Sequence, residues 1–237
     1  RHSITKMSHL HFTSTDAYRK RVIQLGEHPE RVYNVGAIGI DNIRQLPLLD
    51  KNELEKELGF NLGQKYLLVT YHPVTLEHAT ADEQFRNLLT ALDQVTNVEE
   101  KIKIIFTKAN ADTEGRIINQ LIENYVAKHP EKAISFTSMG QLRYLSAMKH
   151  CAAVVGNSSS GILEAPSFKV PTVNIGDRQK GRVRAKSVID CDPELDSIQK
   201  ALQKALSSEF VNSLQDMKSP YEKEDTAKNI KNILKTC

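Results

Sequence analysis

Short apolar runs alternate with longer stretches of mixed polarity along most of the chain. The runs are rich in β-branched residues and predict strands at 10–15, 31–37, 65–72, 101–109, 133–138, 152–157 and 171–176. Between them, apolar residues recur every three or four positions, which is the spacing of one helix face. This periodicity predicts helices at 16–26, 81–95, 112–128, 140–149, 161–168, 196–207 and 223–235.

The order of these elements indicates the fold class. Most predicted strands between residues 65 and 176 are followed by a segment of helical length, which is typical of β–α–β units rather than of a sandwich. We therefore predict an α/β fold with a doubly wound, mainly parallel sheet that carries helices on both faces.

One segment departs from this alternation. Residues 36–64, GAIGIDNIRQLPLLDKNELEKELGFNLGQ, combine glycine, proline and charge, and they predict a linker with a domain boundary near Gly39. The chain opens with RHSITKMSHLHF, which has no initiator methionine and resembles the approach to a strand. We expect the chain to be the remainder of a larger protein.

The composition is that of an ordinary globular protein and argues against several other classes of protein. Of 237 residues, 40% are hydrophobic and 26% charged, as in ordinary globular proteins, and no run approaches the ~20 apolar residues of a membrane span. The net charge of +3 is too small to indicate nucleic-acid binding. Cys151, Cys191 and Cys237 are far apart and fit neither a disulfide framework nor a CxxC metal motif. We expect a cytoplasmic protein without a cofactor, metal, membrane or nucleic-acid partner.

Polar segments follow five of the predicted strands. They read YHPVTLEH, KANADTEG, TSMGQ, GNSSSG and GDRQKGR. Because the carboxyl ends of parallel strands meet at one edge of a sheet, we expect these segments to converge there, where doubly wound sheets bind ligands.

The segment GNSSSGILEA, which begins at Gly156, is rich in small hydroxyl residues. At a helix start, unsatisfied N–H groups and the helix dipole favour an anion, and the hydroxyls of Ser158 and Ser159 would add donors for a phosphate. The alternative is an ordinary serine N-cap, which needs only one such residue. Glu164, one turn later, is either a solvated acid or an acceptor for a sugar diol.

His72 ends an apolar strand directly before a proline. A neutral imidazole there can donate to a phosphate or take part in proton transfer. A turn histidine that makes one backbone bond explains the position equally well. Asn110 and Asp112 follow the next strand, and the start of a helix is a sufficient explanation for both.

The segment GDRQKGRVRAK is basic and contains Arg178, Lys180, Arg182, Arg184 and Lys186. A solvated loop is the usual explanation of such a run. Its place after a strand also favours an anionic partner, with Arg178 nearest to the strand end. The chain has no tryptophan, and this segment has no interleaved aromatic residues on which nucleic-acid bases could stack.

Four segments together resemble the hydrolysing UDP-N-acetylglucosamine 2-epimerases. They are RHSITKMSHLHF, HPVT, GNSSSGILEA and NIGDRQKGR, in this order, and the resemblance continues to the closing YEKEDTAKNIKNIL. It implies the two-domain GT-B architecture, in which a nucleotide sugar binds in the cleft between two Rossmann-like domains.

By this resemblance the chain is the carboxy-terminal part of such a protein. Residues 1–38 would be the remainder of the amino-terminal Rossmann-like domain, 39–219 the linker and the UDP-binding domain, and 220–237 a helix that crosses back. Most of the amino-terminal domain, with the acidic catalytic residues of the family, would be missing. The full-length protein would be a homodimer or a larger oligomer, and this chain alone would bind UDP weakly without epimerising UDP-N-acetylglucosamine.

The implied reaction begins with elimination of UDP, which leaves 2-acetamidoglucal. Water then adds at the anomeric carbon and a proton returns to C2 from the opposite face, which gives N-acetylmannosamine for sialic-acid-type sugar synthesis. In this reaction His72 would contact the diphosphate and assist the leaving group. Ser158 and Ser159 would bind phosphate.

The resemblance also implies contacts to the nucleoside. Asn110 would lie near the nucleotide, and Met139 would offer backbone atoms to the uracil. Glu164 would bind the ribose hydroxyls, and Arg178 would lie at the nucleotide end of the site.

Three other functions remain as alternatives. A non-hydrolysing epimerase would return UDP-N-acetylmannosamine instead of free UDP. A GT-B glycosyltransferase would need an acceptor sugar, and a stand-alone nucleotide-binding module would bind its ligand without turnover.

Overall fold

The structure is a computed structural model that describes residues 2–73, 81–98, 102–110 and 113–236. The chain forms two compact units: unit 1 comprises Arg1–Leu46 and Lys218–Cys237, and unit 2 is Pro47–Met217. The division after Leu46 lies later than the expected boundary near Gly39, because helix α3 (Ile38–Gln45) packs against the last helix of unit 1.

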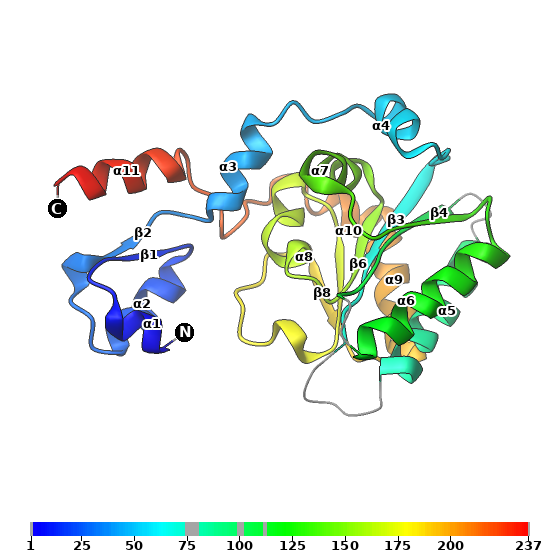
Figure 1. The fold of residues 1–237 in the computed structure, drawn as a ribbon, viewed down its shortest axis with the longest axis horizontal. Coiled ribbons are helices and arrows are strands. Elements are labelled where there is room, and N and C mark those ends of the chain that lie inside the picture. Colours follow the sequence, from blue (N-terminus) through cyan, green and yellow to red (C-terminus); the bar gives the residue numbers. More distant parts are fainter. Residues whose placement is uncertain (1, 74–80, 99–101, 111–112, 237) are drawn as a thin grey trace. The chain divides into compact units, whose positions relative to one another are not determined.

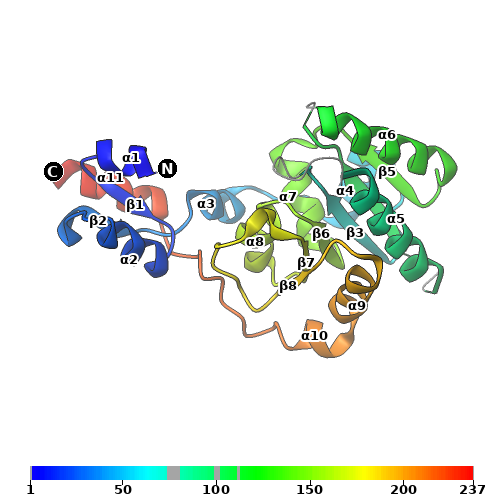
Figure 2. The ribbon, with the colours of Figure 1, turned by 90° about the horizontal axis from the view of Figure 1, so that it is seen from below.

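Unit 2 contains a six-stranded sheet with the order β5-β4-β3-β6-β7-β8. Its strands are β3 (Lys65–Thr70), β4 (Ile102–Thr107), β5 (Ala133–Phe136), β6 (Ala153–Gly156), β7 (Thr172–Ile175) and β8 (Val188–Cys191). All neighbouring strands in it run parallel, and Figure 2 shows β3, β6, β7 and β8 side by side. The predicted doubly wound parallel sheet is confirmed.

Helices cover both faces of this sheet (Figure 1). One face carries α5 (Ala81–Val98), α6 (Thr113–Lys128) and α9 (Leu195–Leu206), and the other carries α4 (Lys51–Leu58), α7 (Gly140–His150), α8 (Ser160–Leu163) and the 3-10 helix η2 (Ala165–Phe168). Successive residues of β3 point to opposite faces, so Leu67 and Val69 belong to one apolar core and Tyr66 and Leu68 to the other. Because β3 is buried on both faces, the position of its carboxyl end is fixed. The candidate site residue His72 follows shortly after this end.

Unit 1 is built from both ends of the chain. It contains α1 (His2–Met7), β1 (His11–Thr13), α2 (Asp16–Gln24), η1 (Pro29–Arg31), β2 (Val32–Asn34), α3 and α11 (Thr226–Thr236), and β1 pairs with β2 in parallel. The Asp41 carboxylate accepts hydrogen bonds from the N–H groups of Thr226 (3.3 Å) and Ala227 (2.7 Å), at the start of α11. The Thr226 hydroxyl donates to the Val35 carbonyl at 2.7 Å. These bonds join the two segments of the unit.

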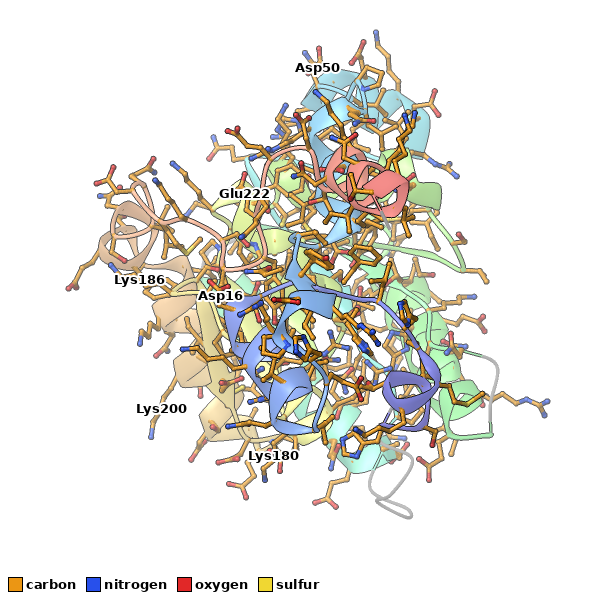
Figure 3. The ribbon with its side chains drawn as sticks, turned by 90° about the vertical axis from the view of Figure 1, so that its left-hand side faces the viewer. Asp16, Asp50, Lys180, Lys186, Lys200 and Glu222 are labelled. Carbon is orange, nitrogen blue, oxygen red and sulfur yellow. The ribbon has the colours of Figure 1, made fainter. Side chains whose placement is uncertain are left out.

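Several elements differ from those predicted. The expected linker contains two helices, α3 and α4, and α4 starts with a capping box in which Asp50 (labelled in Figure 3) and Glu53 exchange side-chain-to-backbone hydrogen bonds. The opening residues form α1 rather than the approach to a strand, and β8 and α10 (Ser208–Asn212) were not predicted. Within the described ranges, none of the helices combines the length and the apolar character that crossing a membrane requires.

Candidate functional site

The carboxyl ends of β3, β6 and β7 lie at one edge of the sheet. β3 pairs with β4 on one side and with β6 on the other, so the chain moves outward from β3 through β4 and β5 and then returns to its other side. This reversal is the topological switch point at which doubly wound sheets bind ligands. The segments after the three strands carry His72, Ser158, Ser159 and Arg178. For the segments that follow β3, β6 and β7, the parallel order confirms the predicted convergence on one edge.

Asn157 links these three segments. Its side-chain oxygen accepts from the His72 N–H and its side-chain amide donates to the His72 carbonyl, both at 2.8 Å. The Asn157 carbonyl accepts from the Arg178 guanidinium (3.0 Å) and from the Gln179 side-chain amide (2.8 Å). Because Asn157 is fully buried, these bonds are protected from water and hold the three segments in register.

Gly156 allows β6 to turn directly against β3. Its φ is +129°, and a Cβ at this position would lie 1.9 Å from the Thr70 carbonyl oxygen. The next residue, Asn157, donates its N–H to the same oxygen at 3.1 Å. Only glycine fits this conformation and this close approach, so the residue determines where Asn157 and the serines that follow are placed.

The serine segment begins a shorter helix than predicted. In place of one helix over 161–168, α8 ends at Leu163 and a 3-10 helix follows from Ala165. Pro166 lacks the N–H that a continuing α-helix needs, which explains the change. The dipole of so short a helix is small, so anion binding here depends mainly on hydroxyl donors and nearby cations. Ser158, Ser159 and Ser160 are all partly exposed.

Glu164 lies between α8 and η2 and is partly buried. Among the described residues, none forms a hydrogen bond with its buried Oε2 atom. Burial raises the pKa of the Glu164 carboxyl, while a backbone hydrogen bond and the charge of Arg182 act in the opposite direction. A buried acceptor without a partner can bind ligand hydroxyl groups without first losing bonds to the protein.

The basic segment after β7 has mixed roles. Lys180 pairs with Asp177 (2.8 Å), Arg184 pairs with Asp190 (3.1 Å), and Lys186 donates to the Ser213 carbonyl (3.0 Å); Figure 3 labels the exposed Lys180 and Lys186. These pairs support the interpretation of a solvated loop for most of the segment.

Arg178 and Arg182 differ from the other basic residues of this segment. Arg178 is exposed overall, but neighbouring protein partly desolvates its guanidinium; this desolvation and then the charge of Arg182 lower the pKa of Arg178, so the two cations lie close to each other. Arg182 also acts on Glu164, and among the described residues no hydrogen bond or ion pair holds its side chain. Among the described basic residues of this segment, these two arginines are therefore the ones available to an anion.

Two predicted residues are not joined to this network within the described residues. Asn110 is exposed after β4. Met139 is buried at the start of α7, where its carbonyl accepts from the Arg143 side chain at 2.8 Å and its side chain packs in the apolar core. Asp112 lies outside the described residues.

The sequence interpretation did not select Asn157 or Arg182 as site residues. Asn157 stands directly after the glycine that ends β6, and an amide at such a position is a signal for a side chain that bonds to backbone. Arg182 has no such signal, because only the folded loop shows which basic residues lack internal partners. Within the described ranges, no group of three or more His, Cys, Asp or Glu side chains could hold a metal ion.

A model of one protein family matches almost the whole chain. The family is described as UDP-N-acetylglucosamine 2-epimerase, and the match covers residues 1–235. The chain belongs to this family. The resemblance on which the sequence interpretation rested is thereby confirmed.

Curated relatives support the same assignment. The hydrolysing GDP/UDP-N,N'-diacetylbacillosamine 2-epimerase of Campylobacter jejuni is 46% identical over 210 residues, which are 89% of this chain and 53% of the relative. The polysialic acid biosynthesis protein P7 of Escherichia coli is 41% identical over 235 residues, or 99% of this chain and 59% of the relative. The chain thus spans about half to three fifths of the length of these relatives.

Solved structures show the same fold. The S. aureus MnaA–UDP co-structure matches with a TM-score of 0.77 at 16% identity. The match covers 98% of this chain and 60% of the MnaA chain. The Methanocaldococcus jannaschii UDP-GlcNAc 2-epimerase, in complex with UDP-GlcNAc and UDP, has a TM-score of 0.76 at 18% identity, with coverages of 98% and 62%. The predicted α/β fold of the GT-B type is confirmed.

Proposed function

We propose that the protein to which this chain belongs is a hydrolysing UDP-N-acetylglucosamine 2-epimerase, and that unit 2 binds the UDP group. In this proposal unit 1 belongs to the first Rossmann-like domain and unit 2 is the second. The names of the Campylobacter jejuni and Escherichia coli relatives support hydrolysis and a place in sialic-acid-type sugar synthesis. The protein would act in the cytoplasm as a homodimer or a larger oligomer.

The observation that supports this proposal most strongly is the link made by Asn157. It holds together the end of β3, the serine segment and the arginine loop, at the switch point of the sheet. Hydroxyl donors at Ser158 and Ser159 and the charge of Arg178 are what a diphosphate requires. The three groups come from segments that share one buried residue, so they are preorganised for the ligand.

The nucleoside would extend from this diphosphate site. In the proposal, the Oε2 atom of Glu164, which has no hydrogen-bond partner among the described residues, accepts hydrogen bonds from the ribose hydroxyls. Backbone atoms at Met139, where α7 begins, contact the uracil, and Asn110 lies near the nucleotide.

In the proposed reaction, the two domains contribute different catalytic groups. When UDP leaves, the C1–O bond breaks, a proton is lost from C2, and 2-acetamidoglucal forms. Unit 2 would stabilise the negative charge that grows on the departing diphosphate, with His72 as a donor to the leaving oxygen. The groups that move the C2 proton would come from the other domain. Water then adds at C1 and a proton returns to C2.

A second candidate substrate has its own support. The Campylobacter jejuni relative, which is 46% identical, is named for UDP-linked or GDP-linked N,N'-diacetylbacillosamine rather than for UDP-N-acetylglucosamine. Both nucleotide sugars would place the same diphosphate against the serine segment. They differ in the sugar, which would lie outside the contacts described above.

The two substrates can be compared in one assay on the full-length protein. We expect free UDP and N-acetylmannosamine from UDP-N-acetylglucosamine, at a higher kcat/KM than for UDP-N,N'-diacetylbacillosamine. The reverse order would support the second candidate. UDP-N-acetylmannosamine as the product would contradict hydrolysis, and turnover that requires an acceptor sugar would indicate a glycosyltransferase. The 237-residue chain alone should bind UDP and release none from the substrate.

Replacing Glu164 by Ala should weaken UDP binding by about 1–3 kcal/mol, because the ribose hydroxyls lose a charged acceptor. The affinity for inorganic pyrophosphate, which has no ribose, should be nearly unchanged. Calorimetric titration of the chain with both ligands measures the two effects. Glu209→Ala, at an exposed acid of α10, is the charge-matched control and should affect neither ligand. Equal weakening of both ligands in Glu164→Ala would mean that Glu164 supports the fold instead.

A further inference from the structure

A chain of hydroxyl groups leads from α7 to the serine segment. The Tyr144 hydroxyl lies 2.6 Å from the Ser160 hydroxyl oxygen, and the Ser160 hydroxyl donates to the Ser158 hydroxyl oxygen at 3.0 Å. Tyr144 belongs to α7 and Ser160 begins α8, which lie on the same side of the sheet (Figure 1). The chain therefore runs from the helical layer to the edge where Ser158 is partly exposed.

The direction of these hydrogen bonds is determined by counting protons. Each hydroxyl has one hydrogen to donate. The Ser160 hydrogen is used toward Ser158, so in the bond between Tyr144 and Ser160 the tyrosine must be the donor. Burial raises the pKa of the Tyr144 phenol above its ordinary value, so the phenol keeps its proton at physiological pH.

The Ser158 hydroxyl then still has its hydrogen to donate. Its oxygen accepts from the Ser160 hydroxyl and, at 3.4 Å, from the Ser160 N–H. Among the described residues, none accepts a hydrogen bond from the Ser158 hydroxyl. Its hydrogen is thus available to a ligand, and a hydroxyl that already accepts hydrogen bonds is polarised into a stronger donor.

We propose that Tyr144 is a positioning residue that acts through Ser160 to set the Ser158 hydroxyl as a donor to a ligand phosphate. The inference rests on the proposed function, because the acceptor is the diphosphate of that ligand. The short length of α8 supports the inference. The dipole of so short a helix adds little to anion binding, so binding depends more on the hydroxyl donors.

Tyr144→Phe tests this role in the 237-residue chain. The substitution keeps the ring and removes the phenol hydroxyl, together with its hydrogen bonds to the side chains of Ser160 and Thr70. Calorimetric titration should show an affinity for inorganic pyrophosphate that is lower by about 3- to 10-fold, as expected for one hydrogen bond. The affinity for uridine, which has no phosphate, should be unchanged. A general loosening of the site would weaken both ligands.

Tyr66→Phe is the matched control. Tyr66 is also a tyrosine next to the same apolar core, and its buried hydroxyl donates to the Ala147 carbonyl at 2.7 Å, away from the serine segment. Tyr66→Phe should lower the melting temperature and leave the affinities for both ligands unchanged. An equal loss of pyrophosphate affinity in Tyr66→Phe and Tyr144→Phe would overturn the proposal.

A double-mutant cycle tests whether Tyr144 acts through Ser160. Ser160→Ala should weaken pyrophosphate binding by at least as much as Tyr144→Phe, and the double variant should bind no more weakly than Ser160→Ala. Additive losses would overturn the proposal, and so would an unchanged affinity in Tyr144→Phe, while the proposed function stands. A wild-type chain that binds neither UDP nor pyrophosphate would overturn both.

Discussion

Replacing His72 by Ala in the full-length protein should slow the release of UDP from UDP-N-acetylglucosamine by about 10²–10³-fold, the usual effect of losing one preorganised donor. His72 follows β3 at the switch point, and its backbone is held on both sides by the Asn157 side chain. In the proposed function, the imidazole donates to the diphosphate from the edge that carries the serine segment. Its effect should therefore be largest when the C1–O bond breaks.

The second half of the reaction provides the internal control for His72→Ala. Hydration of supplied 2-acetamidoglucal has no leaving diphosphate, so the variant should slow this step much less. His150→Ala is the matched structural variant, because the His150 ring bonds to the Leu49 carbonyl at 3.0 Å within the helical layer. It should lower the melting temperature and leave both steps nearly unchanged. Equal slowing of both steps in a well-folded His72→Ala variant would refute the leaving-group role.

Gly156→Ala should reduce the free energy of unfolding of unit 2 by about 3–5 kcal/mol, which combines backbone strain with steric overlap. The new Cβ would lie 1.9 Å from the Thr70 carbonyl oxygen, which is backbone of the neighbouring strand and cannot rotate away. Either β6 separates from β3 or the turn changes its path. Both responses would displace Asn157, so UDP binding should be lost together with stability. Urea unfolding and calorimetry measure the two losses.

Gly59→Ala separates the effect of backbone strain from the effect of steric overlap. Gly59 also has a positive φ of +61°, at the end of α4, and a Cβ there meets nothing within 4 Å. Its replacement should cost only about 1 kcal/mol, from backbone strain alone, and UDP binding should persist. If Gly156→Ala cost no more than Gly59→Ala, the close approach of β6 to β3 would not matter for stability.

The sequence predicted the elements whose residues are buried on both sides. β3, β4, β6 and β7 are mostly apolar runs, because strands of a covered parallel sheet face two cores. β8 was missed because Val188–Cys191 is only partly buried at the edge of the sheet and includes the exposed Asp190. For α4 a signal was present, since Asp50 and Glu53 have the spacing of a capping box.

The candidate site was predictable only as far as the local pattern extends. The order of strands and polar segments was enough to bring His72, Ser158 and Arg178 to one edge. The reciprocal bonds of Asn157 to His72 join residues 85 positions apart, so no local pattern could indicate them. The same holds for Tyr144 and Ser160, which come from different elements. Periodicity describes one element at a time, whereas these contacts depend on how elements pack.

The two-segment construction of unit 1 has a consequence for synthesis on the ribosome. Unit 2 is continuous from Pro47 to Met217, so it can fold before the carboxy-terminal segment is made. The residues up to Leu46 leave the ribosome before unit 2, yet Asp41 has no helix to cap until Thr226 and Ala227 have been added. Of the two units, unit 2 can therefore complete its fold first, although part of unit 1 precedes it in the sequence. During translation, the surface of unit 1 that receives α11 stays uncovered until α11 itself emerges.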